Sequence, residues 1–254
     1  MQEHGSLHKI TKITLVEQTV DRVQSYVLNQ QLQPGDTLPS EMRLAEKLGV
    51  SRPVVREALR TLVGRGMLTI ANGRNAIISP VTATALVHFF ERATQLNAVT
   101  VRELLEVRRG IEVQSISLAA QRRTESHIAK LQSLLAMMSD ARYDLQLYSE
   151  LDAQLHLQIA AASQNQMIYY FVESLGDALR QVSLAGLLNR RNQTELDEVH
   201  TMHMLLVNAV VTQNGLLAES TMASHVEAAM IALSRSDENG MIPGIQADKM
   251  ATSL

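Results

Sequence analysis

Several polar residues in the second half of the chain have the types and spacing of metal ligands. Asp152 and His156 are four residues apart, so they share one face of a helix, among apolar neighbours. His203 and His225 lie on two later helical segments and could join this pair around one divalent cation inside a helical bundle. His200 can share the face of His203, and each histidine could instead be an ordinary structural residue.

Three arginines in the first quarter of the chain have the spacing of a helix that reads DNA. Arg52, Arg56 and Arg60 recur every four residues and share one face, while apolar side chains lie largely on the opposite side. A helix of this kind fits the major groove, where arginine can donate two hydrogen bonds to guanine. An ordinary solvated helix has the same pattern, so the neighbouring elements must decide between the two interpretations.

The neighbouring elements predict a helix-turn-helix followed by a hairpin. Three helices are expected, at 14–31, 40–48 and 52–65. Two short strands are expected after them, at 67–71 and 75–79. They are joined across Asn72-Gly73-Arg74, and Asn-Gly is the strongest short signal for a hairpin. A hairpin directly after a helix-turn-helix is a wing, whose phosphate contacts would position the protein on DNA.

The rest of the chain is helical in pattern. Seven helices are expected, at 82–97, 100–122, 125–142, 144–163, 165–190, 193–213 and 215–235. Strand signals and internal repeats are missing, so the sequence predicts an all-α bundle. Metal sites in such bundles are built from side chains on facing helices, which is the arrangement that the Asp and His residues need.

The composition limits the chemistry of any such site. The 254 residues are enough for two domains, and the cysteine count is zero. Disulfides, cysteine-ligated zinc, iron–sulfur clusters and a thiol nucleophile are therefore excluded, and a metal must be held by His, Asp or Glu. Aromatic residues make up 3% and tryptophan is absent, which disfavours base stacking on single strands.

The net charge of −3 combines two unlike parts. Residues 1–78 carry ten Lys and Arg against seven Asp and Glu, whereas residues 79–254 carry thirteen against nineteen. This split indicates a mildly basic first module and an acidic second one. The chain has no apolar run approaching about eighteen residues, and residues 1–12 lack an apolar signal core, so we expect a cytoplasmic protein that makes no membrane contact.

The predicted fold is mainly α, with an N-terminal winged helix-turn-helix and a C-terminal seven-helix bundle. Pro80 marks the boundary between the two. The expected organisation is a flexible N-terminus at 1–12, a DNA-binding domain at 13–79, an all-α domain at 80–236 and a flexible tail at 237–254.

The run PGDTLPSEMRLAEKLGVSRPVVREALRTLVGRGMLTIANGRNAII resembles the winged-helix domain of the GntR family of bacterial transcription regulators. The resemblance covers about residues 13–79, and its landmarks fall in order and at the family spacing. It implies DNA contacts from Ser51, Arg52, Arg56, Asn72 and Gly73. Many family members have Arg directly after the Glu of LPSE, where this chain has Met42, so Arg43 is a candidate to replace that contact.

Three segments of the second part resemble the FCD effector domain of FadR-like GntR regulators. They are LLEVRRGIEVQSISLAAQ at 104–121, DAQLHLQIAAASQNQM at 152–167 and HMLLVNAVVTQNGLLAESTMASH at 203–225. The resemblance implies one divalent metal ion per chain, zinc, nickel or manganese, held by Asp152, His156, His203 and His225. It favours His203 over His200, because His203 lies six residues before the landmark Ala209.

The FCD resemblance also implies a small organic carboxylate as effector. Arg108 and Asn165 match family residues near the effector pocket, although Arg108 could simply bridge to Glu112, four residues on. Sugar acids, hydroxy acids, short dicarboxylates and fatty-acid derivatives all occur as effectors in related domains.

The expected function is a homodimeric regulator that binds a palindromic double-stranded operator and is released by its effector. Activation is the open alternative to repression, and a metal sensor, in which the cation itself is the signal, is a close rival. A metal-dependent hydrolase would leave the winged helix unexplained and would need a general base. The nearest acid, Glu150, points away from Asp152, so no catalytic residue is assigned.

Overall fold

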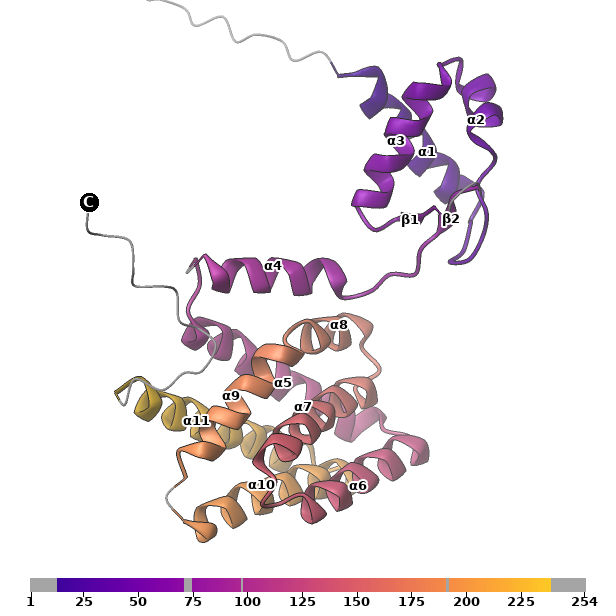
Figure 1. Ribbon diagram of the computed structural model, residues 1–254. Coiled ribbons are helices and arrows are strands. Elements are labelled where there is room, and N and C mark those ends of the chain that lie inside the picture. The colour runs from indigo at the N-terminus through magenta and orange to yellow at the C-terminus, as the bar shows by residue number, and fades with distance from the viewer. Residues whose placement is uncertain (1–12, 71–74, 97, 191, 239–254) are drawn as a thin grey trace, which may run out of the picture. The chain divides into compact units, whose positions relative to one another are not determined.

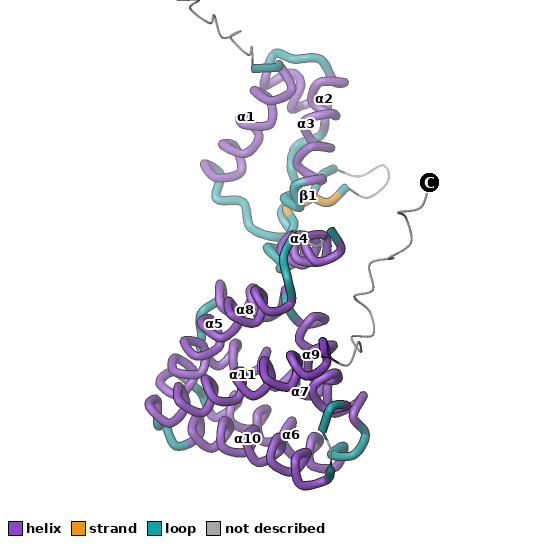
Figure 2. The backbone as a smooth tube through the Cα atoms, turned by 90° about the vertical axis from the view of Figure 1, so that its left-hand side faces the viewer, coloured by secondary structure: helices purple, strands orange, loops and turns teal. Residues whose placement is uncertain are grey.

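The computed structural model describes residues 13–70, 75–96, 98–190 and 192–238, which form two compact units that divide between residues 82 and 83. Helices dominate both units, and a small two-stranded sheet is coloured orange in Figure 2. The mainly α fold with a helix-turn-helix and a helical bundle is confirmed. Among the helices described, none has the length and apolar character needed to cross a membrane.

The first unit contains three helices and a two-stranded sheet (Figure 1). Its elements are α1 (Leu15–Asn29), α2 (Glu41–Leu48), α3 (Arg52–Gly64), β1 (Leu68–Thr69) and β2 (Ile77–Ile78). A capping box between Thr14 and Glu17 starts α1, and the Ser40 hydroxyl accepts a hydrogen bond from the Arg43 N–H at the start of α2. Gly49 ends α2 with a φ of 66°, a conformation natural to glycine, and so makes the tight turn into α3.

The apolar face of α3 lies at the centre of the first unit's core. Val55, Leu59 and Leu62 are buried in one cluster with Val20 and Val23 of α1. Because the core takes this face, the arginine-bearing face of α3 is exposed. The amphipathic helix that the residue spacing predicts is therefore present, with its cations available for a partner.

The two strands form the hairpin expected after α3. They pair antiparallel, with Leu68 opposite Ile78 and Thr69 opposite Ile77. Thr37 also pairs with Ile77, so the chain before α2 is attached to the hairpin. The strands are shorter than the predicted 67–71 and 75–79. Asn72 and Gly73, predicted at the wing tip, lie outside the described residues.

The second unit is helical throughout its described residues. Its helices are α4 (Thr84–Gln95), α5 (Val101–Arg122), α6 (Glu125–Asp140), α7 (Leu145–Ala162), α8 (Gln166–Ser174), α9 (Gly176–Leu188), α10 (Gln193–Val211) and α11 (Gly215–Glu238). Six of the seven predicted helices are found with bounds shifted by only a few residues. Their caps include a capping box between Thr100 and Glu103 at the start of α5.

The predicted helix at 165–190 is wrong, because the chain forms two helices there, α8 and α9. The Leu175 N–H bonds back to Val172 O, three residues earlier, and α9 begins at Gly176. Leu175 and Val172 are buried in the same apolar cluster as Leu179 of α9. The apolar pattern therefore continues across the bend, and periodicity alone does not reveal it.

The helices that carry the candidate ligands share one core. Ile116 of α5, Leu155 of α7, Leu206 of α10 and Met222 of α11 are fully buried in one cluster. In addition, α7 packs against α5, α6, α8 and α9, and α11 packs against α5, α9 and α10. This packing brings side chains that are distant in the sequence to the same interior, where polar residues must find partners.

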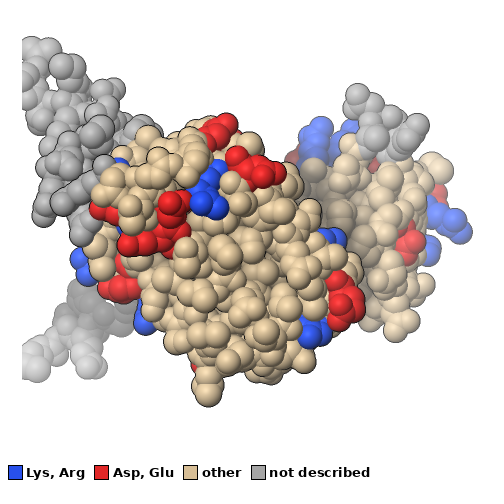
Figure 3. All heavy atoms as spheres, turned by 90° about the horizontal axis from the view of Figure 1, so that it is seen from below, with Lys and Arg blue, Asp and Glu red and all other residues tan. Residues whose placement is uncertain are grey.

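The surface of the second unit carries both signs of charge. On the face in the foreground of Figure 3, acidic and basic side chains lie in small separate groups with other residues between them. Both signs are expected, because residues 79–254 carry thirteen Lys and Arg as well as nineteen Asp and Glu.

Candidate metal centre and nucleic-acid interface

The four predicted metal ligands come together inside the second unit. Asp152 and His156 lie one turn apart on α7, His203 lies on α10 and His225 on α11. One ligand atom from each residue lies within 4.8 Å of the others, and all four residues are buried. A cluster that was only a possibility from residue types is therefore a single site in the fold.

The ligand atoms face one another at short distances. Asp152 Oδ1 lies 2.8 Å from His203 Nε2 and 3.3 Å from His156 Nε2. His156 Nε2 and His225 Nε2 are 3.1 Å apart. Three imidazole nitrogens and one carboxylate oxygen thus converge. This donor set, with no thiolate, suits a divalent transition-metal ion.

Two further side chains orient the histidine rings. His156 Nδ1 lies 2.8 Å from Glu112 Oε2 of α5, and His203 Nδ1 lies 3.0 Å from the Tyr148 hydroxyl of α7. Each contact occupies the Nδ1 side of a ring, so Nε2 is left to face the cluster. Sequence reasoning missed these two roles. Glu112 was considered only as a partner of Arg108, and Tyr148 is recognisable as the residue one helical turn before Asp152.

His203 belongs to the cluster and His200 does not. His200 is buried one turn earlier on α10, where its Nδ1 lies 3.3 Å from the Tyr148 hydroxyl. Burial is the main cause of its lowered pKa, which favours the neutral ring. His200 therefore lies beside the cluster without belonging to it. The resemblance to the FCD domain likewise favours His203 as the ligand.

The charges in the cluster give Asp152 and His225 the protonation states that metal ligands require, whereas His156 must lose a proton to bind a metal. Burial works against ionised Asp152, but His203 and His156 outweigh it and hold the pKa of this carboxyl well below its usual value. Burial, together with His203 and His156, keeps the pKa of His225 well below its usual value, so this ring is neutral. Burial alone would lower the pKa of His156, yet Glu112 raises it to about 9.

The cluster also contains polar atoms that the protein leaves unsatisfied. Asp152 Oδ1 and His203 Nε2 are buried and have no hydrogen-bond partner among the described residues, because their 2.8 Å contact lacks hydrogen-bond geometry. Buried polar atoms without partners are unusual in folded proteins. A cation between the converging donors would satisfy both atoms, so the residues fit a metal ion.

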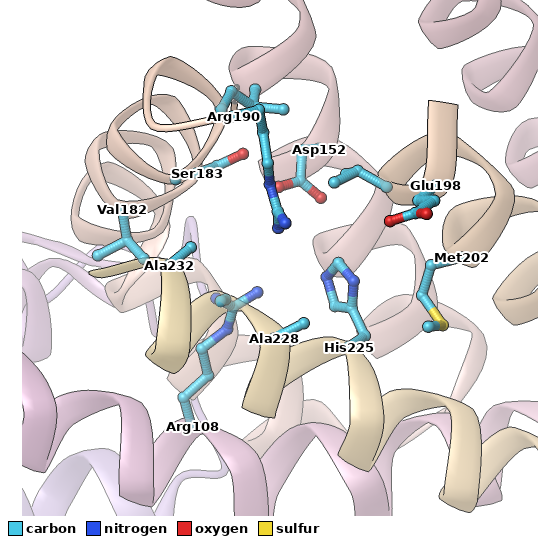
Figure 4. Close-up of a pocket in the computed structure, with 14 residues that line it drawn as sticks. Arg108, Asp152, Val182, Ser183, Arg190, Glu198, Met202, His225, Ala228 and Ala232 are labelled. Atoms are coloured by element: carbon cyan, nitrogen blue, oxygen red, sulfur yellow. The ribbon is translucent and has the colours of Figure 1, made fainter. Parts of the chain in front are cut away.

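A cavity of about 160 Å³ adjoins the cluster (Figure 4). Asp152 and His225 line it from the cluster side, and Arg108 of α5 lines it from another wall. Arg108 is only 4% exposed, and its Nε donates a hydrogen bond of 2.8 Å to Glu112 Oε1. Figure 4 shows its guanidinium reaching toward the cavity. Arg108 thus bridges to Glu112 and also presents charge to the cavity, so the two interpretations of this residue are compatible.

Asn165, the second predicted effector contact, is placed elsewhere. It is the N-cap of α8, and its Oδ1 accepts hydrogen bonds from the N–H groups of Met167 and Ile168. It is not among the residues that line the cavity. The structure therefore gives Asn165 a local role in starting a helix and does not bring it to the candidate effector site.

The exposed face of α3 presents the predicted DNA-binding residues unequally. Ser51 and Arg52 are exposed at the start of the helix, and Arg43 is exposed on α2. Arg52 makes no ion pair within the described part of the chain. Arg56 pairs with Glu41 of α2, with Nη2 2.8 Å from Oε2 and Nε 3.2 Å from both carboxylate oxygens. This pair lowers the pKa of Glu41 and links the two helices.

Replacing Tyr148 by Phe is expected to weaken divalent-metal binding about tenfold while leaving the fold intact. The substitution removes only the hydroxyl that holds His203 Nδ1, so the ring loses its fixed orientation. Competition titration with a chromogenic chelator measures the metal affinity. Tyr143→Phe, at a side chain that is 59% exposed, is the matched control. Equal affinities of the two variants would contradict the positioning role of Tyr148.

Together, the fold and the cluster define a class of protein. A helix-turn-helix with a hairpin, followed by a helical bundle that contains a metal-ligating cluster and a cavity, is the architecture of a DNA-binding regulator with a second, helical domain. Residues 15–78 match the bacterial regulatory proteins of the gntR family, and residues 103–228 match the FCD domain. The chain belongs to the GntR family, and its FCD domain fits the FadR-like subfamily.

Individual relatives support this assignment along most of the chain. The HTH-type transcriptional regulator LutR of Bacillus subtilis (strain 168) is 30% identical over 204 residues, which are 79% of this chain and 92% of LutR. The Glc operon transcriptional activator of Escherichia coli (strain K12) is 29% identical over 224 residues, 84% of this chain and 86% of the activator. The structure of Streptococcus agalactiae GntR has a TM-score of 0.64 and 25% identity, covering 85% of this chain and 99% of that chain.

These comparisons establish a function at the level of the family. The matched families and relatives are transcription regulators and not enzymes. The protein is therefore a DNA-binding transcription regulator of the GntR type.

Proposed function

We propose that the protein is a cytoplasmic repressor that leaves its operator when a small organic carboxylate binds in the FCD domain. The main support for this proposal is that the cluster of candidate metal ligands and the side chain of Arg108 line the same cavity. The ligand cluster opens onto a cavity of about 160 Å³ through Asp152 and His225, and the guanidinium of Arg108 faces the same cavity. An arginine in an enclosed site is the usual partner of a carboxylate.

In this proposal the cluster holds one divalent ion, zinc, nickel or manganese, through Asp152, His156, His203 and His225. When bound, the ion supplies a Lewis-acidic partner for a carboxylate oxygen. Arg108 orients the carboxylate by charge-assisted hydrogen bonds, and Glu112 keeps Arg108 in place through the bond to its Nε. Both groups favour an anion over a neutral molecule of the same size.

The DNA-binding role rests on the exposed residues of the first unit. In the proposal Ser51, Arg52 and Arg56 contact the operator from α3, and Arg43 contributes from α2. Asn72 and Gly73 of the wing complete the contacts. A single recognition helix reads only a few base pairs, so a homodimer on a palindromic operator supplies the required specificity. If effector binding changes the spacing of the two DNA-binding units, effector and operator affinities are linked reciprocally.

The test uses the full-length protein and DNA fragments that it selects from a random-sequence library. Affinity for a selected fragment is measured with metal-loaded protein, with and without sugar acids, hydroxy acids, short dicarboxylates and fatty-acid derivatives. We expect at least one carboxylate to weaken DNA binding about tenfold or more, within the usual range of allosteric coupling. Tighter DNA binding with effector would indicate activation instead. A response to metal alone, with no effect of any carboxylate, would indicate a metal sensor and contradict the proposal.

A further inference from the structure

A second arginine, Arg190, faces the cavity beside the ligand cluster. It follows the end of α9, where its backbone N–H bonds to Leu187 O. Figure 4 shows its side chain running from the upper wall of the cavity into the interior, opposite Arg108. Both arginines are among the residues that line the cavity. The sequence pattern shows only a break between two helices at this position, so Arg190 was not a candidate before the fold was known.

Arg190 differs from Arg108 in having no anionic partner among the residues that the structure describes. Arg108 is paired through Nε with Glu112, and Asp152 faces the histidines of the cluster. By contrast, Nε of Arg190 is buried without a hydrogen-bond partner, and Arg190 makes no ion pair within the described residues. A buried guanidinium nitrogen without a partner is unfavourable, and an anion that enters the cavity would relieve it.

The remaining acid on the cavity wall does not compensate this charge. Glu198 of α10 is exposed and lies to the right of Arg190 in Figure 4, and no ion pair joins these two residues. The cavity therefore offers an anionic ligand two separate cationic groups, Arg108 and Arg190. Its volume of about 160 Å³ is close to that of a protein cavity that holds benzene, so the ligand has a skeleton of roughly that size.

We propose that Arg190 is a specificity-determining residue that binds a second anionic group of the effector. The preferred effector is accordingly a short dianion, such as a four-carbon dicarboxylate, with one carboxylate at Arg108 and the other at Arg190. This inference rests on the proposed function, since it assumes that the cavity takes a carboxylate. It goes further because it predicts that the protein binds dianions more tightly than monoanions of the same chain length.

The test compares matched pairs of ligands that differ in one carboxylate. Butanedioate is compared with butanoate, and 2-hydroxybutanedioate with 2-hydroxybutanoate, by calorimetric titration of the zinc-loaded full-length protein. We expect the wild type to bind the dianion of at least one pair about 10- to 100-fold more tightly than the monoanion, the range of a charge-assisted hydrogen-bonded contact. Arg190→Gln is expected to reduce dianion binding to the level of the monoanion and to leave monoanion binding within about twofold.

Two further variants make the result specific to Arg190. Arg180→Gln removes one positive charge from α9, the helix that ends just before Arg190. Arg180 pairs with Asp177 and does not line the cavity, so the dianion preference of this variant should equal that of the wild type. Arg190→Lys, which keeps the charge, should retain part of the preference. An unchanged preference in Arg190→Gln, or no preference in the wild type, would overturn the inference while leaving the proposed function intact. Failure of all four ligands to bind the wild type would also overturn the inference, whereas the proposed function fails only if no carboxylate of its wider panel changes DNA binding.

Discussion

Replacing His156 by Ala is expected to yield a purified protein without a stoichiometric divalent metal and without a response to carboxylates. His156 Nε2 lies 3.3 Å from Asp152 Oδ1 and 3.1 Å from His225 Nε2, so its loss removes a donor from the middle of the cluster. The substitution also leaves the buried Glu112 without its contact to His156 Nδ1. Elemental analysis of the purified variant measures the metal directly.

The same variant should keep most of its affinity for DNA, because the winged helix is a compact unit with its own core. A titration with a selected DNA fragment tests this separation. His88→Ala is the control, since His88 is an exposed histidine that pairs only with Glu91 in the described structure. It should retain both metal and effector response. Retention of one equivalent of metal by the His156 variant would refute the assignment of this ligand.

Replacing Arg52 by Ala should weaken binding to the selected operator by roughly 1–3 kcal/mol and relax the preference for one base pair. Arg52 is the first residue of α3, is exposed, and makes no ion pair within the described residues, so its guanidinium is free to bond to a base edge. Arg56 differs because Glu41 holds it by two nitrogens. Fluorescence anisotropy with operator variants measures both the affinity and the base preference.

Arg60→Ala is the matched control for this prediction. Arg60 lies two turns further along the same face and pairs with the exposed Glu57, so the variant loses the same charge from the same helix. Loss of a phosphate contact should weaken binding to all sequences alike, whereas loss of a base contact should weaken binding mainly to the preferred sequence. If the two variants lost equal affinity on selected and random DNA, Arg52 would have no role in reading bases.

Local sequence patterns anticipated most of the elements. Ser40, Gly49 and Pro53 mark the ends of α2 and α3 because capping, a positive φ and a missing N–H act within one helical turn. The bend at Leu175 escaped prediction because apolar residues before and after it, Val172 and Leu179, pack in the same cluster as Leu175. The apolar periodicity therefore shows no break there. The pairing of Thr37 with Ile77 also escaped prediction, because it joins segments that are forty residues apart in the sequence.

The sequence by itself determined the class of fold, the helix proposed to read DNA and the residue types of the candidate metal ligands. These follow from spacing along one element: Asp152 and His156 are one turn apart on any helix, and so are Arg52 and Arg56. The tertiary structure decided what depends on helices that are distant in sequence. The packing of α5, α7, α10 and α11 in one core placed Glu112 against His156 and joined His203 and His225 to the pair on α7.

The cavity was likewise decided by tertiary structure alone. Arg108 and Arg190 are 82 positions apart in the chain, and no local periodicity relates them. Their side chains face one cavity because α5 lines one wall and the end of α9 another. Asn165 is an example of a predicted contact that the fold does not place at the cavity. Its side chain caps α8 by accepting hydrogen bonds from nearby backbone N–H groups. Residue types set the chemistry that is possible, and long-range packing sets which groups meet.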